Sequence, residues 1–371
     1  MLALVITIVV LIIGIAIFVN TAPQFGESPK GDRLTFIESS PNYSEGQFQN
    51  LVETSMDMAP REIPGLMMKF STGRKKREPQ KELPSKFDFS RNSRIDSLVY
   101  VTWFGHSAIM LEMEGKRILI DPMLGPAASP VSFMTKRFPY KDPIDINEIE
   151  DIDAVILSHD HYDHLDYPSI IVLKDKVDHF YTALAVGEHL KRWGVEESKI
   201  TELDWWQSSE LDDIQLIATP ARHFSGRGFG DRNKSQWASW VIIGKHSRIF
   251  FSGDSGYAGH FKEIGEKYGP FNFTMMECGQ YNELWKAIHM MPEESVQGHI
   301  DLKGKVMMPI HWGAFNLSLH DWTDPIVRAS AEAKRLNVNM VNPIIGETFV
   351  VGQDLPEETW WTFKEKIVSA H

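Results

Sequence analysis

Short apolar runs separated by polar turns make up most of the chain from Leu98 onward. Runs with the length and the β-branched or aromatic content of strands lie at residues 99–103, 108–113, 117–120, 152–157, 214–219, 239–243, 248–251, 273–276 and 305–310. The tight turn at 114–116 predicts a hairpin between two of them. Residues 167–173 and 185–193 have the pattern of short helices, and Gly194 is a typical stop signal. The pattern predicts a region that mixes strands with helices.

The beginning of the chain has a different pattern, an apolar run without a charged residue at 2–19. Its length approaches the roughly 20 residues that cross a bilayer as a helix. No lysine or arginine precedes the run, and it is longer than the apolar part of a signal peptide, which is about 7–15 residues. We predict a retained single-pass anchor at residues 1–20, with a cleaved signal peptide as the alternative. Basic and acidic residues are mixed after the run, so the side of the membrane stays open.

Residues 21–97 are predicted to form an irregular N-terminal extension, because prolines recur through this part and polar runs separate them. A short helix is expected at 48–58. The cluster Arg74–Arg77 is basic in a chain that is acidic overall. A solvated loop is one interpretation of this cluster, and contact with anionic lipid headgroups is the other.

Composition narrows the classes of function. Lys and Arg total 38 and Asp and Glu total 50 in 371 residues, which gives a net charge of −12. This balance argues against a broad nucleic-acid surface, and we expect no nucleic-acid partner. Cys278 is the single cysteine, so no internal disulfide can form. A homodimer is compatible with the sequence.

Three histidines and an aspartate of metal-binding type lie close together at His159, His161, Asp163 and His164. They follow the apolar run at 154–157, which predicts a buried strand that ends at this cluster. Alternate residues of an extended segment point the same way, so His159 and His161 can reach one ion. Asp163 and His164 lie in the turn that follows and can reach a second ion. Imidazoles and carboxylates suit zinc, and also manganese or iron.

Further residues of the same type follow strand-like runs later in the chain. They are His223, Asp254 and His311. Because loops at the ends of neighbouring strands meet at one edge of a sheet, these residues can share a site with the cluster. We assign to the first ion His159, His161 and His223, and to the second Asp163, His164 and His311. Asp254 is expected to bridge two ions about 3.5–4 Å apart, which together ionise a water to hydroxide.

Several other residues are candidates for supporting roles. Asp121, at the end of a predicted strand, can orient a ligand imidazole or cap the turn before Pro122. His106 is expected to support the site or to be structural. Arg227 is a candidate for meeting a phosphate. An apolar groove for acyl chains, or alternatively the core, is expected to contain Trp205, Trp206, Phe224, Trp237 and Trp312.

The His-x-His-x-Asp-His motif at 159–164, together with the three later residues, resembles the ligand set of metallo-β-lactamase-fold hydrolases. The segments around it are more similar to one branch of that fold, the N-acyl-phosphatidylethanolamine-hydrolysing phospholipase D family and its bacterial relatives. Segments that carry this resemblance lie at 101–106, 161–167, 202–206, 251–257, 268–271 and 310–313. The similarity extends over about residues 99–350.

The resemblance implies a fold of the α/β (α+β) class, a four-layer αββα sandwich at residues 98–352, followed by a C-terminal tail at 353–371. It implies two Zn²⁺ ions in a groove between two sheets, with Mn²⁺ or Fe²⁺ as alternatives. The implied reaction is hydrolysis of a phosphodiester by a metal-bridging hydroxide, which splits N-acyl-phosphatidylethanolamine into N-acylethanolamine and phosphatidic acid. The expected partners are a phospholipid or other phosphodiester substrate and, through residues 1–20, a membrane.

Three residues are expected to be catalytic. Asp163 and Asp254 hold the ions that ionise the water, and His289 falls where the family has a histidine close to the metals. The resemblance gives His289 a role in positioning the substrate or in the departure of the leaving group, and a surface histidine at the start of a helix is the alternative. Two other functions stay open, a lactonase-like hydrolase of carbonyl substrates and a non-catalytic membrane scaffold that binds metal only for folding. Residues 2–19 and 21–97 depart from the family pattern.

Overall fold

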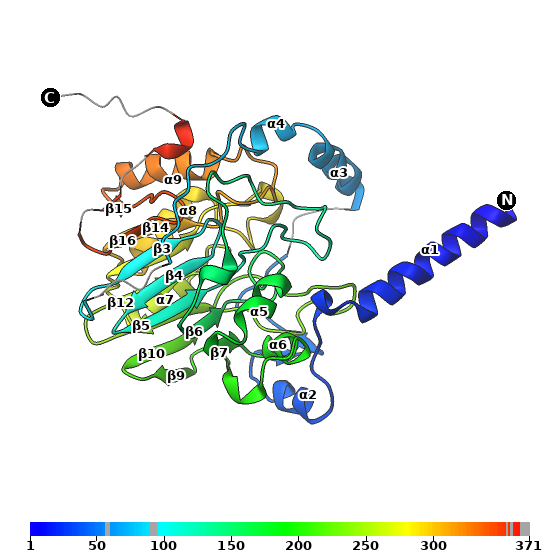
Figure 1. Cartoon of the computed structure of the whole chain (residues 1–371), viewed down its shortest axis with the longest axis horizontal. Coiled ribbons are helices and arrows are strands. Elements are labelled where there is room, and N and C mark those ends of the chain that lie inside the picture. The colour runs from blue at the N-terminus through cyan, green and yellow to red at the C-terminus, as the bar shows by residue number, and fades with distance from the viewer. Residues whose placement is uncertain (56–59, 90–94, 354, 357–358, 364–371) are drawn as a thin grey trace.

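Two seven-stranded sheets form the centre of the protein, seen in a computed structural model that describes residues 1–55, 60–89, 95–353, 355–356 and 359–363 (Figure 1). The first sheet, in spatial order, consists of β16 Thr348–Val350, β3 Tyr100–Trp103, β4 Ile109–Met113, β5 Lys116–Ile120, β6 Ile152–Leu157, β7 Val177–Ala183 and β8 Ile200–Leu203. The second consists of β15 Asn339–Met340, β14 Val306–Ile310, β13 Phe273–Glu277, β12 Arg248–Phe251, β11 Ser239–Ile243, β10 Ile214–Thr219 and β9 Ser208–Leu211. Every strand predicted from the apolar runs is present, with small shifts at its ends.

Helices cover the outer faces of both sheets, which confirms the predicted order of layers, helix, sheet, sheet, helix (Figure 1). The helices of the first sheet are α5 Tyr167–Leu173 and α6 Gly187–Arg192, and those of the second are α7 His260–Lys267, α8 Pro292–Asp301 and α9 Asp324–Arg335. One large apolar cluster joins the two sheets, and a smaller one joins the second sheet to α7, α8 and α9. Strands such as β13 and β14 are buried along their whole length because both faces are covered.

Both sheets combine antiparallel hairpins with parallel strands. In the first, β3, β4 and β5 pair antiparallel, and β6 lies parallel between β5 and β7. In the second, β12, β13 and β14 are parallel to one another. Parallel strands end at the same edge of a sheet, so the loops that follow β6, β12, β13 and β14 are brought together there.

The first helix, α1 Leu2–Thr21, projects from the rest of the molecule, and none of its residues is buried (Figure 1). By length and composition α1 is able to cross a membrane, and N-terminal signal sequences meet the same criteria. Its side-chain hydroxyl and amide groups bond back to the helix itself, as Thr7 does to the Ala3 carbonyl at 3.0 Å. The last turn of α1 contacts the rest of the chain, since Phe18 meets Phe25 edge-on at 5.4 Å and Arg192 donates to the Thr21 carbonyl at 3.1 Å.

The rest of the extension contributes several buried residues to the core of the protein. Its elements are α2 Gly31–Glu38, β1 Tyr43–Ser44, β2 Gln47–Phe48, α3 Ile63–Ser71 and α4 Arg74–Arg77. Ile37, Phe48 and Leu83 are fully buried in the main apolar cluster. The helix predicted at 48–58 is wrong for residues 48–55, which form no helix, and 56–58 lie outside the described residues. The reason is that Asn50 bonds to the main chain of His223, which fixes a non-helical path.

Candidate metal centre

One group of four side chains comes together at the end of β6. His159 Nε2 lies 2.9 Å from His161 Nδ1, which lies 3.2 Å from His223 Nε2. Asp254 Oδ2 is 3.8 Å from both His159 Nε2 and His223 Nε2. All four ligand atoms fall within 4.8 Å of one another. Three imidazoles and one carboxylate at these separations surround a space suited to a single cation.

A second group adjoins the first and contains Asp163, His164 and His311, with His106 as a fourth member. Asp163 Oδ2 lies 2.8 Å from His106 Nε2 and 3.3 Å from His311 Nε2. Asp254 contacts this group too, with Oδ1 at 3.1 Å from His164 Nε2 and Oδ2 at 3.1 Å from His311 Nε2. The structure thus brings together all seven residues that the sequence predicted to be ligands. Asp254 lies between the two groups.

Four of the histidines are held by an acceptor at Nδ1, which leaves Nε2 facing the centre. The acceptors are Ser158 Oγ for His159 (2.9 Å), Asp121 Oδ2 for His164 (2.6 Å), the Ile288 carbonyl for His223 (2.9 Å) and the Gly279 carbonyl for His311 (3.3 Å). A proton on Nδ1 fixes the tautomer in which Nε2 carries a lone pair, as metal-binding histidines require. Among the described residues, His164 Nε2 and Asp254 Oδ1 are buried without a hydrogen bond. These features fit a donor set arranged for cations.

Asp121 has the first of the two roles considered from the sequence, because it orients a ring. Its carboxylate accepts hydrogen bonds from His164 Nδ1 and from the Ser158 amide at 2.7 Å. Ser158 Oγ, which also bonds to Asp121, holds His159. One fully buried carboxylate therefore positions an imidazole in each group.

The pKa values of the histidines differ between the two groups. Burial lowers the pKa of His159 and of His223 well below the usual value, so both rings are neutral. Burial acts in the same direction on His164 and His311, but the carboxylates of Asp254 and Asp163 outweigh it. They raise the pKa of His164 well above its usual value and that of His311 to about 10. The second group therefore has an excess of negative charge that a cation can neutralise.

Glu277 is a further residue of the site, and the sequence analysis missed it. It ends β13, is fully buried, and hydrogen-bonds to His289 Nδ1. The same carboxylate lies 3.6 Å from His311 Nδ1. The His289 ring stacks 5.2 Å from the His311 ring and lies 5.0 Å from the His223 ring, and its side chain is 13% exposed. His289 is thus beside both groups and partly open to solvent. The rule that would have found Glu277 is the one used for Asp254, a lone carboxylate directly after an apolar strand.

One expectation about the surroundings of the site is wrong. Arg227, expected to meet a phosphate, is buried and donates to the main-chain oxygens of Asp160, Leu165 and Gln24. For Trp205, Trp237 and Trp312 the structure confirms the second of the two alternatives, because all three are buried in the main apolar cluster. By contrast, the half-buried Phe224 contacts the rings of His161 (4.5 Å) and His223 (4.8 Å).

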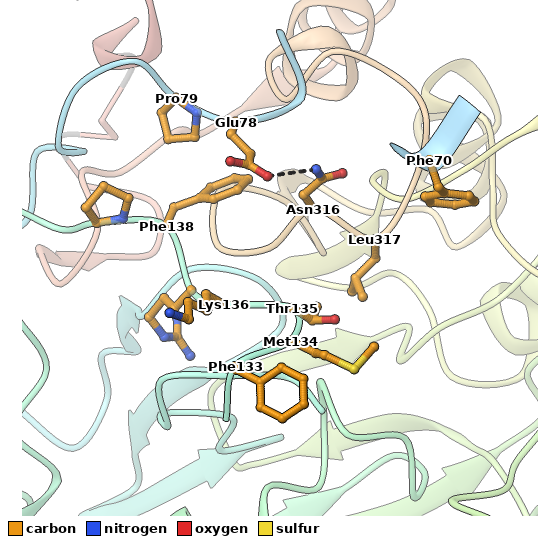
Figure 2. A pocket seen from close by; sticks show the side chains of 12 residues that line it. Phe70, Glu78, Pro79, Phe133, Met134, Thr135, Lys136, Phe138, Asn316 and Leu317 are labelled. Carbon is orange, nitrogen blue, oxygen red and sulfur yellow. Dashed lines mark hydrogen bonds between the residues drawn. The ribbon is translucent and has the colours of Figure 1, made fainter. Parts of the chain in front are cut away.

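A cavity of about 560 Å³ lies near the same edge of the sheets. Figure 2 shows Phe70 and Leu317 across from Phe133 and Met134. Arg137, which also lines the cavity, stacks at 4.7 Å on Phe315, whose ring is 5.3 Å from that of His106. The cavity therefore neighbours the second group.

Comparison with known proteins agrees with this geometry. The family model described as Beta-lactamase superfamily domain matches residues 116–312. An uncharacterized protein of Mycobacterium tuberculosis is 37% identical over 87% of this chain and 88% of its own length. The N-acyl-phosphatidylethanolamine-hydrolyzing phospholipase D 1 of Caenorhabditis elegans is 31% identical over 61% of this chain and 67% of its own length. A metallo hydrolase from Ignicoccus hospitalis has the same fold, with a TM-score of 0.54 and 21% identity over 68% of this chain and 98% of that one. The chain belongs to the beta-lactamase superfamily and is a metal-dependent hydrolase of the metallo-β-lactamase fold.

Proposed function

We propose that the protein is a membrane-associated phosphodiesterase that holds two Zn²⁺ ions and cleaves N-acyl-phosphatidylethanolamine. The first ion is held by His159, His161 and His223, and the second by Asp163, His164 and His311. The observation that carries this proposal is the position of Asp254, with one oxygen 3.1 Å from His164 Nε2 and the other 3.1 Å from His311 Nε2 and 3.8 Å from His159 Nε2. Mn²⁺ or Fe²⁺ suits the same donors.

When bound, the two cations lower the pKa of a shared water toward about 7 and stabilise the charge that develops at phosphorus. The chain's own residues set the geometry for this step. Asp254 holds the two positions together, and Asp163 is itself held by His106. Asp121 and Ser158 keep two of the imidazoles from rotating. Such fixed donors avoid the cost of reorganisation during the reaction.

His289 is proposed to donate a proton to the leaving oxygen. Glu277 occupies its Nδ1, so Nε2 is the nitrogen free to face a substrate. An alkoxide anion is a poor leaving group, whereas the same oxygen departs readily as the neutral alcohol if it is protonated while the P–O bond breaks, and a positioned imidazole can supply that proton. The His289 side chain is 13% exposed, so a substrate can reach it. Five of the seven proposed ligands are almost completely buried, and the exceptions are His161 and Asp163.

The lipid substrate is supported by two independent features. One is the relative from Caenorhabditis elegans, whose name states hydrolysis of N-acyl-phosphatidylethanolamine. The other is α1, which we propose to be retained as a single-pass membrane anchor, so that lipid headgroups lie within reach of the metal centre. The products are N-acylethanolamine and phosphatidic acid.

The test is hydrolysis by the full chain in detergent micelles containing N-acyl-phosphatidylethanolamine, with released N-acylethanolamine measured beside a panel of lactones. Removal of metal by a chelator should abolish release, and added Zn²⁺ should restore it together with about two ions per chain. Hydrolysis of lactones alone identifies a lactonase-like enzyme and contradicts the proposal. Metal binding without hydrolysis of any substrate supports the scaffold alternative and contradicts it as well.

A further inference from the structure

The end of α1 is fixed against the hydrolase core. Gln24, just after the helix, donates from Nε2 to the Pro130 carbonyl at 2.9 Å, and its own carbonyl accepts from Arg227 at 2.9 and 3.0 Å. The Trp193 indole donates to the Pro23 carbonyl at 2.7 Å. These contacts hold the exit of the helix at one place on the surface, between the loop that contains Pro130 and the loop that contains Arg227.

Both of these loops carry large apolar side chains that face solvent. In the first loop Phe133 is 74% exposed and Met134 54% exposed, and in the second Phe229 is 88% exposed. Phe133 is three residues from Pro130, and Phe229 is two residues from Arg227. At no more than about 3.6 Å per residue, the main chain of Phe133 lies within about 11 Å of that of Pro130, and the main chain of Phe229 within about 7 Å of that of Arg227. Both loop tips are therefore only a few residues from a residue that contacts Gln24 at the end of α1.

Charge on these loops fits an anionic lipid surface. The exposed Lys136 follows the first tip and the exposed Arg232 follows the second, in a chain with a net charge of −12. The acid in the second loop, Asp231, is occupied by the amides of Arg227 and Gly228. An apolar tip with a basic rim is the arrangement of side chains that enter the interface of a bilayer.

The metal centre adjoins the same place. Tyr162 lies between His161 and Asp163 in sequence, its ring meets Phe25 edge-on at 6.4 Å, and the Arg227 guanidinium lies 4.0 Å above it. Phe133 and Met134 also form one wall of the 560 Å³ cavity (Figure 2). The apolar surface thus continues from a loop tip into a space beside the second group.

We propose that Phe133, Met134 and Phe229 enter a phospholipid bilayer together with α1, as a three-point membrane surface that turns the metal centre toward the lipid. The proposal rests on the anchoring role of α1 in the proposed function. Side chains of this kind reach about 5–10 Å into the headgroup and acyl boundary. Two loop tips beside a single helix also prevent the body of the protein from swinging freely about its anchor.

The experiment uses the full chain in vesicles of phosphatidylcholine and phosphatidylglycerol, with an environment-sensitive nitrobenzoxadiazole dye on single introduced cysteines. Cys278 is fully buried and stays unlabelled in the folded protein. The positions are Met134→Cys and Phe229→Cys, with Val327→Cys on α9, 51% exposed, as the matched control and Gly14→Cys as the reporter of α1. We expect a blue shift and quenching by nitroxide-labelled lipid at positions 14, 134 and 229 but not at 327.

Quenching at position 14 with none at 134 and 229 overturns the three-point surface and leaves the anchor intact. Absence of quenching at all positions overturns both. The catalytic proposal is tested separately on the same labelled proteins. Hydrolysis of a short-chain substrate is measured in detergent, where no bilayer is needed. Failure of that hydrolysis with quenching at 134 and 229 supports the surface and contradicts only the enzyme function.

Discussion

The buried histidines of this protein lie in two kinds of surroundings. At the edge where the strands end, His164 and His311 each face a carboxylate oxygen of Asp254 at 3.1 Å. His260, the first residue of α7, and His299, in α8, instead face hydroxyl groups. His260 Nε2 lies 3.2 Å from Ser255 Oγ, and His299 Nδ1 lies 2.7 Å from Thr274 Oγ1.

The pKa values of the four rings follow these partners. Burial opposes the charged form in every case. At the strand edge the nearby carboxylates overcome it and raise the pKa of His164 and His311. In the helices nothing opposes burial strongly enough, and the pKa of His260 falls to about 3 and that of His299 to about 4. Among these four rings, the two that face Asp254 belong to the candidate cation site, whereas the two beside a hydroxyl are polar parts of the core.

The largest effect is expected from Asp254→Asn. It removes the charge shared by the two groups, so we expect hydrolysis to fall on the order of 10³-fold and metal content to fall with it. Metal analysis and released N-acylethanolamine measure the two losses. Asp213→Asn is the control, because Asp213 is exposed and pairs with the exposed Lys245 at 2.6 Å. Unchanged metal content would remove Asp254 from the site.

Glu277→Gln should lower hydrolysis by about 100-fold, because the carboxylate no longer fixes the His289 ring. The loss should be much smaller for a substrate with a nitrophenol leaving group, which departs without a proton. The measurement compares the hydrolysis rates of the parent and the variant on the two substrates. Glu294→Gln, which alters only the bond to the Met291 amide at the start of α8, is the control. An equal loss on both substrates would mean that Glu277 supports folding or metal binding instead.

Asp121→Asn should weaken metal binding about tenfold, because His164 loses a charged acceptor while the ligands themselves stay in place. Competition with a chromophoric chelator gives the affinity. The control is Asp301→Asn, since Asp301, the last residue of α8, accepts from Tyr257 at 2.6 Å and belongs to neither group of the metal centre. If both variants bind metal as the parent does, orientation of His164 contributes nothing measurable.

The smallest effect is expected from His299, one of the two histidines that face a hydroxyl group. The pKa of His299 is lowered to about 4 in the folded protein, below its ordinary value of 6.5, so folding favours the neutral ring. Its contribution is complete above pH 6.5 and is lost as the pH falls toward 4. His299→Gln should remove this dependence, which amounts to about 1.5 kcal/mol between pH 6.5 and 5. Urea unfolding of both proteins across this range measures it, and parallel pH profiles would contradict the assignment.

Local patterns were enough to predict much of the site. The cluster at 159–164 is contiguous in sequence, His311 directly follows a strand-like run, and Asp254 comes three residues after another. The same reasoning fails where a side chain's surroundings decide its role. Nothing near Arg227 in the sequence indicates that three main-chain oxygens surround it. Trp237 and Phe224 are equally aromatic, yet only the second reaches the site.

The incorrect prediction of a helix at 48–55 has a related cause. The prediction used only the residues of that segment, but Asn50 makes two hydrogen bonds with the main chain of His223, far away in sequence. Tertiary contacts of this kind override local propensity. Glu277 is the opposite case, because the pattern of a lone acid after an apolar strand was present and was not applied to it.

The contacts that hold the end of α1 also decide how a water-soluble form should be made. A chain that starts at Ala22 loses the apolar helix and keeps the acceptors of Arg227 and Trp193. A chain that starts at Gly31 deprives the Trp193 indole of its acceptor and Arg227 of the Gln24 carbonyl, one of its three acceptors, and it removes the Glu27 amide that binds His189 at 3.0 Å. Each such loss costs about 1–3 kcal/mol. The shorter product should therefore express poorly although it lacks no residue of the metal centre.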